Sequence, residues 1–436
     1  MNSNLNYYRI TPGVVEVGKK HKITISTVNK HKAFKSDVQY RILILPSTRN
    51  MRGVTKVPDR THYAYGENGT ISFEYFFEKE EEYFITLFIG DEKKSFAALS
   101  VYAVNEDLYA LRPLKGDQHC HSCPTDARLR TKSDGNSTPR VIPAHYREEG
   151  FDYMTLTDHS RYSGSVEMNE YYSDVKLGIT MNRGEEVHAP RNYVHIVNLG
   201  GEYSVNEIYQ NDPERYEREV KEIMETEEIE YFDKELYAIN LWVARNIRKA
   251  NGIAVFCHPH WNPYVYNVSD ELTKLFMKNN VFDAYEVVGA STFAQNNLKL
   301  ALYNDLKLEG IKMPPMLGSS DCHDFTIPNA TYLRRYTITY AKENTSESIK
   351  EAVRNYMTAP VEKIAGADDY IVHGSYRLVS YTRYLLEWYF PLTRQLVEEE
   401  GLLMRKYILG DESAKEELNK RADNALNFWK KFSGRE

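Results

Sequence analysis

A chain of 436 residues is longer than one hydrophobic core usually supports, so we expect two or more domains. No apolar run is long enough to cross a membrane, and no basic segment precedes an apolar one near Met1, so we expect no membrane contact, no signal peptide and a cytoplasmic location. The net charge of -7 argues against a general nucleic-acid binder, which would carry a basic surplus.

Residues 1–110 are predicted to form an all-β domain. Short stretches rich in β-branched and aromatic residues alternate in part and are separated by polar turns, with Gly90-Asp91-Glu92 as a hairpin signal. The predicted strands are His21–Val28, Val38–Leu45, Thr70–Phe77, Tyr83–Ile89 and Phe96–Val104. Several strands without a long helical period predict a β-sandwich of immunoglobulin-like type.

Residues 111–365 change to strands that alternate with helices, the pattern of an α/β domain. A helix is predicted between Thr138-Pro139 and Gly150, with Pro143 delaying or kinking its start. Further helices are predicted after Asp212-Pro213, over Glu235–Ala250 and over Thr292–Glu309. Strands are predicted over Phe151–Leu156, Ile253–Cys257, Asp283–Val288 and Met316–Ser319.

Residues 366–436 are predicted to be a helical extension. Arg377–Phe390 and Glu412–Phe432 are amphipathic and rich in aromatic residues. We expect these helices to pack on the flank of the α/β domain or to mediate self-association into a homo-oligomer.

The sequence GDQHCHS, from Gly116 to Ser122, places Asp117, His119 and His121 at alternate positions, which on a strand point to one face. Two imidazoles on one face can hold a divalent metal if other segments add ligands, but the motif alone is more typical of surface or hydrogen-bonded histidines. The four cysteines lie beside candidate ligands and show no disulfide spacing, so we interpret them as buried packing residues.

Other candidate ligands follow the predicted strands. Nine of the 13 histidines lie between His119 and His323, and those at strand ends are accompanied by acids. In alternating α/β folds the carboxyl ends of strands carry the chemistry. Imidazole together with bridging carboxylate suits Zn, Mn or Fe, and carboxylates can neutralise two neighbouring cations.

The order of these motifs resembles the PHP (polymerase and histidinol phosphatase) family. The resemblance covers Gly116–Val361 and rests on GDQHCHS, Thr157-Asp158-His159, Gly184-Glu185-Glu186 with His195, Cys257-His258-Pro259-His260, and Asp321-Cys322-His323. It implies a distorted (β/α)7 TIM-like barrel, two to three divalent metal ions and hydrolysis of phosphate esters.

The resemblance also implies a ligand set, arranged as a trinuclear site. The nine ligands would be His119, His121, Asp134, His159, Glu186, His195, His258, Asp321 and His323. Asp134 is assigned because a Pro-led helix follows Ser133-Asp134-Gly135 in register, but Asp126 has the uninterrupted spacing and stays an alternative.

Further roles are expected around these ligands. Glu186 would bridge two metals, and Asp158 or His260 would protonate the leaving oxygen. The candidate substrate contacts are Arg161, Arg191 and His188, although either arginine could equally form a surface salt bridge and His188 could instead support a ligand. Asp117 is expected to orient a ligand imidazole, and Glu185 to be a solvent or salt-bridge residue.

The expected reaction is hydrolysis of a small-molecule phosphate ester, most simply a monoester, by a metal-bound hydroxide. One alternative is a phosphodiesterase or nuclease that uses the same site, although the net charge provides no obvious basic groove. Another is a non-catalytic scaffold that binds a glycan or a protein.

Overall fold

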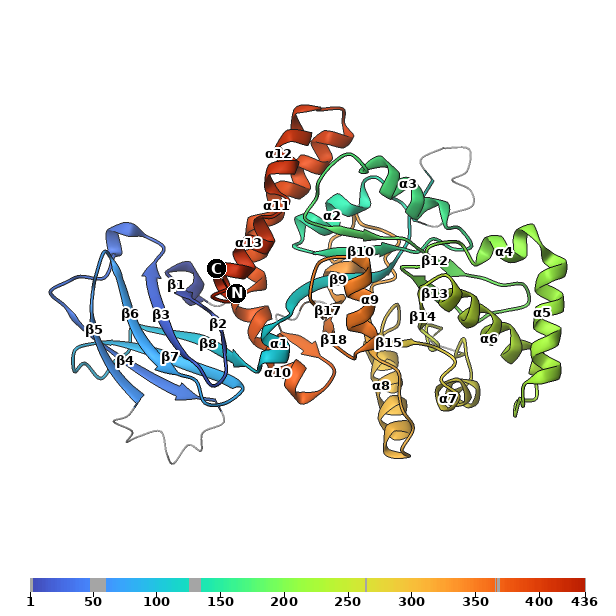
Figure 1. Ribbon diagram of the computed structural model, residues 1–436, viewed down its shortest axis with the longest axis horizontal. Helices are drawn as coiled ribbons and strands as arrows, with labels where there is room; N and C mark the ends of the chain where they lie inside the picture. Colours follow the sequence, from blue (N-terminus) through green and yellow to red (C-terminus); the bar gives the residue numbers. More distant parts are fainter. Residues whose placement is uncertain are drawn as a thin grey trace. The chain divides into compact units, whose positions relative to one another are not determined.

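The computed structural model describes residues 3–47, 60–124, 135–262, 265–364, 366 and 369–435. The chain divides into two compact units (Figure 1). Unit 1 comprises Met1–Arg112, Tyr376–Leu396 and Asp423–Glu436, and unit 2 comprises Pro113–Ser375 and Val397–Ala422. Each unit is a set of β-sheets with helices, so the chain is a mixed α/β protein.

Unit 1 contains two sheets, one of three strands in the order β1-β3-β6 and one of five in the order β2-β8-β7-β4-β5. Its strands are β1 (Tyr8–Thr11), β2 (Val14–Glu16), β3 (Lys20–Thr27), β4 (Gln39–Pro46), β5 (Thr61–Tyr65), β6 (Thr70–Phe76), β7 (Glu81–Ile89) and β8 (Ala97–Val104). Two 3-10 helices, η1 (Ser3–Asn6) and η2 (Lys30–Lys32), and helix α1 (Glu106–Tyr109) complete this part. All five strands predicted in this region are confirmed, within two residues at each end.

Alternation explains why these stretches form strands. In β4 every second residue is buried, and Ile42 and Ile44 are completely inaccessible. Aromatic rings join the two sheets, since Phe77, directly after β6, and Tyr83 of β7 meet edge to face at 5.0 Å between centroids.

Unit 2 contains a six-stranded sheet in the order β11-β10-β9-β17-β18-β19 and a five-stranded sheet in the order β12-β13-β14-β15-β16. The first consists of β9 (Arg112–Cys120), β10 (Tyr153–Leu156), β11 (Thr180–Asn182), β17 (Arg335–Ala341), β18 (Thr358–Lys363) and β19 (Tyr370–Val372). The second consists of β12 (Gly184–Val187), β13 (Ile196–Leu199), β14 (Ile253–Phe256), β15 (Ala284–Val288) and β16 (Met316–Gly318). Two isolated parallel bridges, Cys120 with Cys322 and His159 with Glu186, join the sheets.

Helices lie outside the sheets of unit 2 (Figure 1). They are α2 (Ile142–Glu148), α3 (Ser163–Tyr171), α4 (Asn206–Asn211), α5 (Pro213–Thr226), α6 (Lys234–Lys249), α7 (Asp270–Lys278), α8 (Phe293–Leu308) and α9 (Ser346–Arg354), with the 3-10 helix η6 (Thr331–Leu333). The predicted delay at Pro143 is confirmed, because α2 begins at Ile142. Side-chain caps start α5 to α9, for example Asp212 at α5, where Asp212-Pro213 predicts a helix start, and Thr292 at α8.

The C-terminal helices are α10 (Tyr376–Trp388), α11 (Phe390–Ile408), α12 (Ser413–Arg421) and α13 (Asn424–Phe432). They do not form a separate extension. Helices α10 and α13 belong to unit 1, α12 and the second half of α11 belong to unit 2, and the stretch predicted as the amphipathic helix Glu412–Phe432 is divided between α12 and α13. Apolar faces explain the division, because Tyr384 and Trp429 are buried within unit 1.

No helix in the described ranges combines the length and apolarity that crossing a membrane requires.

A buried ion pair fastens α11 to the rest of unit 2. Arg147 and Glu400 are 0% and 2% exposed, and the Arg147 Nε donates to Glu400 Oε2 at 2.8 Å. The other carboxylate oxygen accepts from the backbone N–H of Gly178 at 2.6 Å, and Arg147 Nη1 donates to the carbonyl of Phe151 at 3.0 Å. Removing one partner would leave the other charge buried without compensation.

We expect Glu400→Ala to lower the free energy of unfolding by about 3–5 kcal/mol, measured by urea denaturation. The matched control is Glu398→Ala, because Glu398 is an exposed residue of the same helix, and its loss should cost under about 0.5 kcal/mol. Equal losses in the two variants would contradict a role for the buried pair.

Candidate metal centre

Segments from both sheets of unit 2 bring histidines and acids together where their strands end. His119 is the second-last residue of β9 and His121 directly follows that strand. His159 follows β10. From the second sheet, Glu186 lies in β12 and His195 directly precedes β13. His258 follows β14, and Asp321 and His323 follow β16.

Glu186 lies at the middle of this cluster and is completely buried. Its Oε1 is 2.7 Å from His195 Nδ1 and 3.6 Å from His258 Nε2. Its Oε2 is 2.6 Å from His159 Nδ1 and 3.6 Å from the Nε2 atoms of both His119 and His121. One carboxylate therefore faces imidazoles from both of its oxygens.

Asp321 supplies a second carboxylate. Its Oδ1 lies 2.8 Å from His121 Nε2 and 3.3 Å from His119 Nε2, and its Oδ2 lies 3.7 Å from His258 Nε2. The backbone of Asp321 has a φ of 48°, in the left-handed region that non-glycine residues seldom adopt. Such backbone strain is retained where surrounding contacts enforce it, commonly at functional sites.

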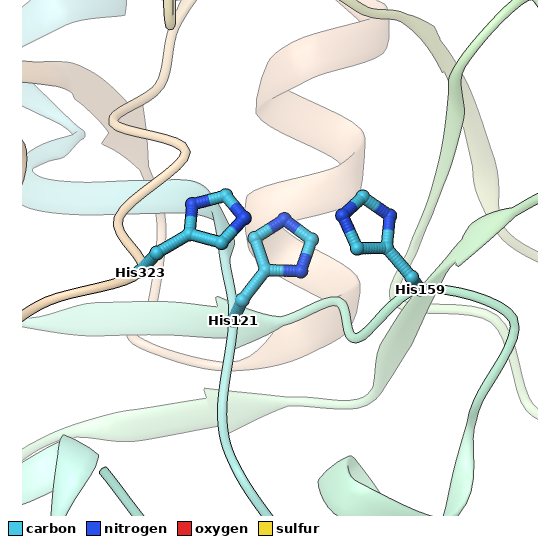
Figure 2. Close-up of side chains that lie close together, drawn as sticks. All are labelled: His121, His159 and His323. Carbon is cyan, nitrogen blue, oxygen red and sulfur yellow. The ribbon is translucent and has the colours of Figure 1, made fainter. Parts of the chain in front are cut away.

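Figure 2 shows three imidazoles of the cluster together, those of His121, His159 and His323. The His121 ring stacks on that of His323 at 4.2 Å and on that of His159 at 4.3 Å between centroids. Each of the three rings offers a nitrogen within 4.8 Å of the others, close enough to share one metal ion.

The polar atoms of this cluster are better placed to bind a cation than to form hydrogen bonds with one another. Both oxygens of Glu186, Asp321 Oδ1, His195 Nδ1 and both ring nitrogens of His258 are buried, yet none forms a hydrogen bond with a described residue. Imidazole nitrogens and carboxylate oxygens whose lone pairs point to one metal position come close together without having hydrogen-bond geometry. Because unsatisfied buried polar atoms are costly, the donor set is suited to divalent metal ions.

The pKa shifts of the cluster also agree with a metal site. Burial would raise the pKa of Glu186, but His195 and His119 hold the pKa of this carboxyl well below its usual range. Burial likewise opposes ionisation of Asp321, and His119 and His121 lower its pKa well below the usual value. Burial lowers the pKa of His195, which favours the neutral imidazole that binds metals.

Sequence reasoning missed Glu286, which lies in β15. Glu286 is completely buried, and its Oε2 is 3.1 Å from Nδ1 of His119, whose Nε2 faces the cluster. A Cβ at Gly289 would lie 1.7 Å from Glu286 Oε1, so glycine leaves room for the carboxylate. A lone Glu in the apolar run Ala284–Val288 was the available signal.

The role predicted for Asp117 is therefore corrected, because Glu286 contacts the ligand imidazole instead. Asp117 is buried and accepts from the Tyr146 hydroxyl at 2.6 Å. Its other oxygen accepts from the backbone N–H groups of His119 and Ser320 at 3.2 and 3.0 Å. Burial raises the pKa of Asp117 to about 6 despite these bonds. Asp117 thus ties the backbone after β16 to that of β9.

The prediction for Glu185 is also corrected, because it is buried rather than exposed to solvent. It accepts hydrogen bonds from the Ser204 hydroxyl at 2.6 Å, the Val205 backbone N–H at 2.5 Å and the Asn206 amide at 2.7 Å. Alternation in β12 explains the difference, since neighbouring residues of a strand point to opposite sides. Glu185 orders residues 204–206 while Glu186 faces the histidines.

Asp158 and Arg161 form a separate pair. Asp158 Oδ1 accepts from the Ser122 backbone N–H at 2.6 Å, and its Oδ2 accepts from the Ser122 hydroxyl at 2.7 Å and from Arg161 Nη2. Both oxygens of Asp158 are thus engaged, which differs from the predicted proton donor. Arg161 is partly exposed and also donates to the Ser122 hydroxyl at 3.0 Å.

Arg191 is held on the surface by two glutamates. Its guanidinium donates to both carboxylate oxygens of Glu217 at 2.9 Å and to Glu235 at 3.0 Å, and these contacts raise its pKa. This arrangement differs from the predicted substrate contact, because both edges of the guanidinium are occupied.

The two remaining predicted histidines occupy different surroundings. His188 joins the cluster, with its Nε2 2.8 Å from His159 Nδ1 and 3.6 Å from Glu186 Oε2. His260 is buried, its Nε2 lies 3.1 Å from Asp270 Oδ1, and its ring stacks on Tyr266 at 4.1 Å. Its Nδ1 has no partner among the described residues.

Asp134 and Asp126 both lie outside the described residues. The four cysteines are free and buried, as predicted. Cys120 donates to the carbonyl of Thr155 at 3.3 Å, whereas Cys257 lies with His119 and Glu286 in a group that could also hold a metal.

Comparison with known proteins gives structural likenesses only. No protein-family model and no curated protein matches the chain. The chain is similar to a two-domain protein from Bacteroides vulgatus containing a predicted PHP-like metal-dependent phosphoesterase, with 19% identity, a TM-score of 0.44 and coverage of 64% of this chain and 71% of that one. It is also similar to an amidohydrolase from Chromobacterium violaceum with bound sulfate and no metal, with 20% identity, a TM-score of 0.32 and coverage of 48% and 87%. Identities this low do not carry a function to this chain.

We expect Glu286→Gln to weaken binding of Zn²⁺ or Mn²⁺ by about 10–100-fold, since it removes the charge that holds the His119 imidazole. Metal affinity measured by chelator competition checks this without an activity assay. Gly289→Ala should weaken binding in the same way, because its Cβ displaces the carboxylate. The control Glu309→Gln, at the exposed end of α8, should bind metal as the unchanged protein does; unaltered affinity in Glu286→Gln would contradict the role.

Proposed function

We propose that the chain is a metal-dependent phosphoesterase of the PHP family. The observation that carries this proposal is the buried Glu186 carboxylate, which meets imidazoles from several segments at both oxygens and forms no hydrogen bond with any described residue. A bridging carboxylate surrounded by imidazoles is the donor set that neighbouring divalent cations need.

The proposed fold of unit 2 is a distorted (β/α)7 barrel. Support comes from the single bridges that join its two sheets, Cys120 with Cys322 and His159 with Glu186, and from the helices on the outside. For residues 1–110 we propose an immunoglobulin-like sandwich, supported by the two sheets that pack through aromatic rings.

The proposed centre holds up to three ions. The ligand residues would be His119, His121, Asp134, His159, Glu186, His195, His258, Asp321 and His323, with Zn, Mn or Fe as the metals. When bound, divalent cations would activate a water molecule as the nucleophile and neutralise charge developing on the phosphoryl oxygens. Glu286 would keep His119 in the orientation that directs Nε2 to the centre.

The chain's own residues would bind and protonate the substrate. His260 is the proposed donor to the leaving oxygen, because its Nε2 is held by Asp270 while its Nδ1 has no described partner. His188, beside His159, is the proposed substrate contact within the cluster. Arg161 can contribute a further donor from its partly exposed guanidinium.

A small phosphate monoester is the proposed substrate. Its phosphoryl group presents three unsubstituted oxygens to a cluster of cations. A nucleic-acid diester would in addition need a basic groove, whereas the chain has a net charge of -7.

The test is turnover of an aryl phosphate monoester against the corresponding diester, together with the metal content of the purified chain. We expect chelation to abolish turnover, Zn²⁺, Mn²⁺ or Fe²⁺ to restore it, and the monoester to react faster. Glu186→Gln should lower kcat/KM by about a thousandfold, the scale of several kcal/mol. Glu207→Gln, at an exposed position in α4, is the matched control. A chain that neither holds metal nor turns over either ester would refute the proposal.

The choice between the two aspartates of the first motif needs its own pair of variants. We expect Asp134→Ala to lower both bound metal and turnover by at least about tenfold, because a ligand carboxylate is lost, and Asp126→Ala to leave both unchanged. Metal content and kcat/KM measured side by side check this. The reverse result would assign Asp126 as the ligand.

A further inference from the structure

The outer face of the five-stranded sheet of unit 1 carries exposed aromatic rings. Tyr63 and Tyr65 lie on β5, the edge strand of that sheet, and are 54% and 55% exposed. They are two residues apart, so their side chains point to the same face. Rings as exposed as these on neighbouring positions are typical of a binding surface.

The strand register links these tyrosines to β7. Arg41 of β4 pairs with Tyr63 on one side and with Phe88 of β7 on the other. The Arg41 guanidinium lies over the Phe88 ring, 4.1 Å from its centroid. Gln39, which pairs with Tyr65, donates to the Tyr65 hydroxyl at 3.2 Å. These contacts show that the side chains share one face of the sheet.

Phe84 extends the row of rings along β7. It precedes Phe88 by an even number of positions, so it faces the same side, and it is 44% exposed. Leu43 and Thr86, which pair with each other between these positions, are uncharged. By the usual strand spacing and rise per residue, the row from Tyr65 to Phe84 is roughly 20 Å long. An extended ligand would fit its length.

A cavity of about 350 Å³ lies at the Phe84 end of the row, within unit 1. Phe84 belongs to its lining, together with Tyr376 of α10, which is 83% exposed. The polar lining includes the carboxylates of Glu82 and Glu387 and the guanidinium of Arg383. A ligand lying along the rings would therefore meet hydrogen-bond acceptors and donors at this end.

Exposed rings beside hydrogen-bonding groups match the chemistry of a sugar. A pyranose ring has apolar C–H groups on its faces, which pack on aromatic rings, and hydroxyl groups at its edge, which donate to carboxylates. The phosphates of a single-stranded nucleic acid would be repelled by Glu82 and Glu387. Arg41 does not offset this repulsion, because its guanidinium already donates to the carbonyls of Gly90 and Glu92 at 3.2 and 2.8 Å.

We propose that unit 1 binds a neutral, linear, β-linked polysaccharide, whose sugar rings stack on Tyr65, Tyr63 and Phe84 and whose hydroxyl groups reach the polar lining of the cavity. A β-linked chain such as cellulose is extended, as a row of rings along a sheet requires, whereas an α-linked chain such as amylose coils. The proposal concerns unit 1 alone and does not rest on the proposed phosphoesterase function.

The experiment is isothermal titration calorimetry of the full chain with the β-linked probes cellohexaose, mannohexaose and xylohexaose. We expect saturable binding of at least one of them, and binding of the α-linked maltohexaose at least about tenfold weaker. Tyr63→Ala and Phe84→Ala should each weaken binding by about tenfold because a stacking ring is lost, whereas Tyr63→Phe should retain the affinity. Phe76→Ala is the matched control, since Phe76 is 51% exposed on β6 of the other sheet of the unit.

The melting temperature of each variant is compared with that of the unchanged chain. If Phe84→Ala disturbs folding, the pair Tyr63→Ala and Tyr63→Phe decides. The proposal would be overturned by no saturable binding of any β-linked probe, by equal affinity in Tyr63→Ala and Phe76→Ala, or by equally tight binding of maltohexaose or of oligothymidylate. A dimer in sedimentation velocity that Tyr63→Ala dissociates, without binding of any probe, would assign this face to a second copy of the chain instead. Phosphoesterase activity and metal content do not enter these readouts.

Discussion

A buried carboxylate among imidazoles is the constraint on which unit 2 depends. Glu186 has no exposed surface, and the nitrogens around it belong to histidines in or near five different strands, β9, β10, β12, β13 and β14. An isolated buried carboxylate is strongly unfavourable, so this arrangement is stable only with compensating positive charge. Imidazolium groups can provide it in part, and divalent cations would provide it fully.

The surroundings of the cluster restrict it further. Glu286 fixes the ring of His119, and Asp117 joins the backbone at His119 to that at Ser320. Glu185, next to Glu186 in β12, organises the following loop through its hydrogen bonds. Carboxylates outside the proposed ligand set thus position the groups within it, and a centre of this kind depends on residues that would never contact the substrate.

Much of the fold followed from patterns in the sequence. Alternation located β3, β4 and β6–β8, and the pair Asp212-Pro213 located the start of α5. The packing partners of the C-terminal helices were harder to predict. An amphipathic pattern indicates that one face of a helix will be buried, but it does not indicate which part of the chain will bury it. The structure divides these helices between the two units, and their apolar faces complete two separate cores.

The sequence by itself determined which residue types gather at strand ends, and hence the histidines and Glu186 of the candidate centre. Only the tertiary structure decided how the acids beside them are used. Glu286 rather than Asp117 meets His119, and Arg191 is engaged by surface glutamates. The physical reason is that periodicity fixes the face on which a side chain lies, whereas its partner comes from another strand whose register only the assembled sheets define.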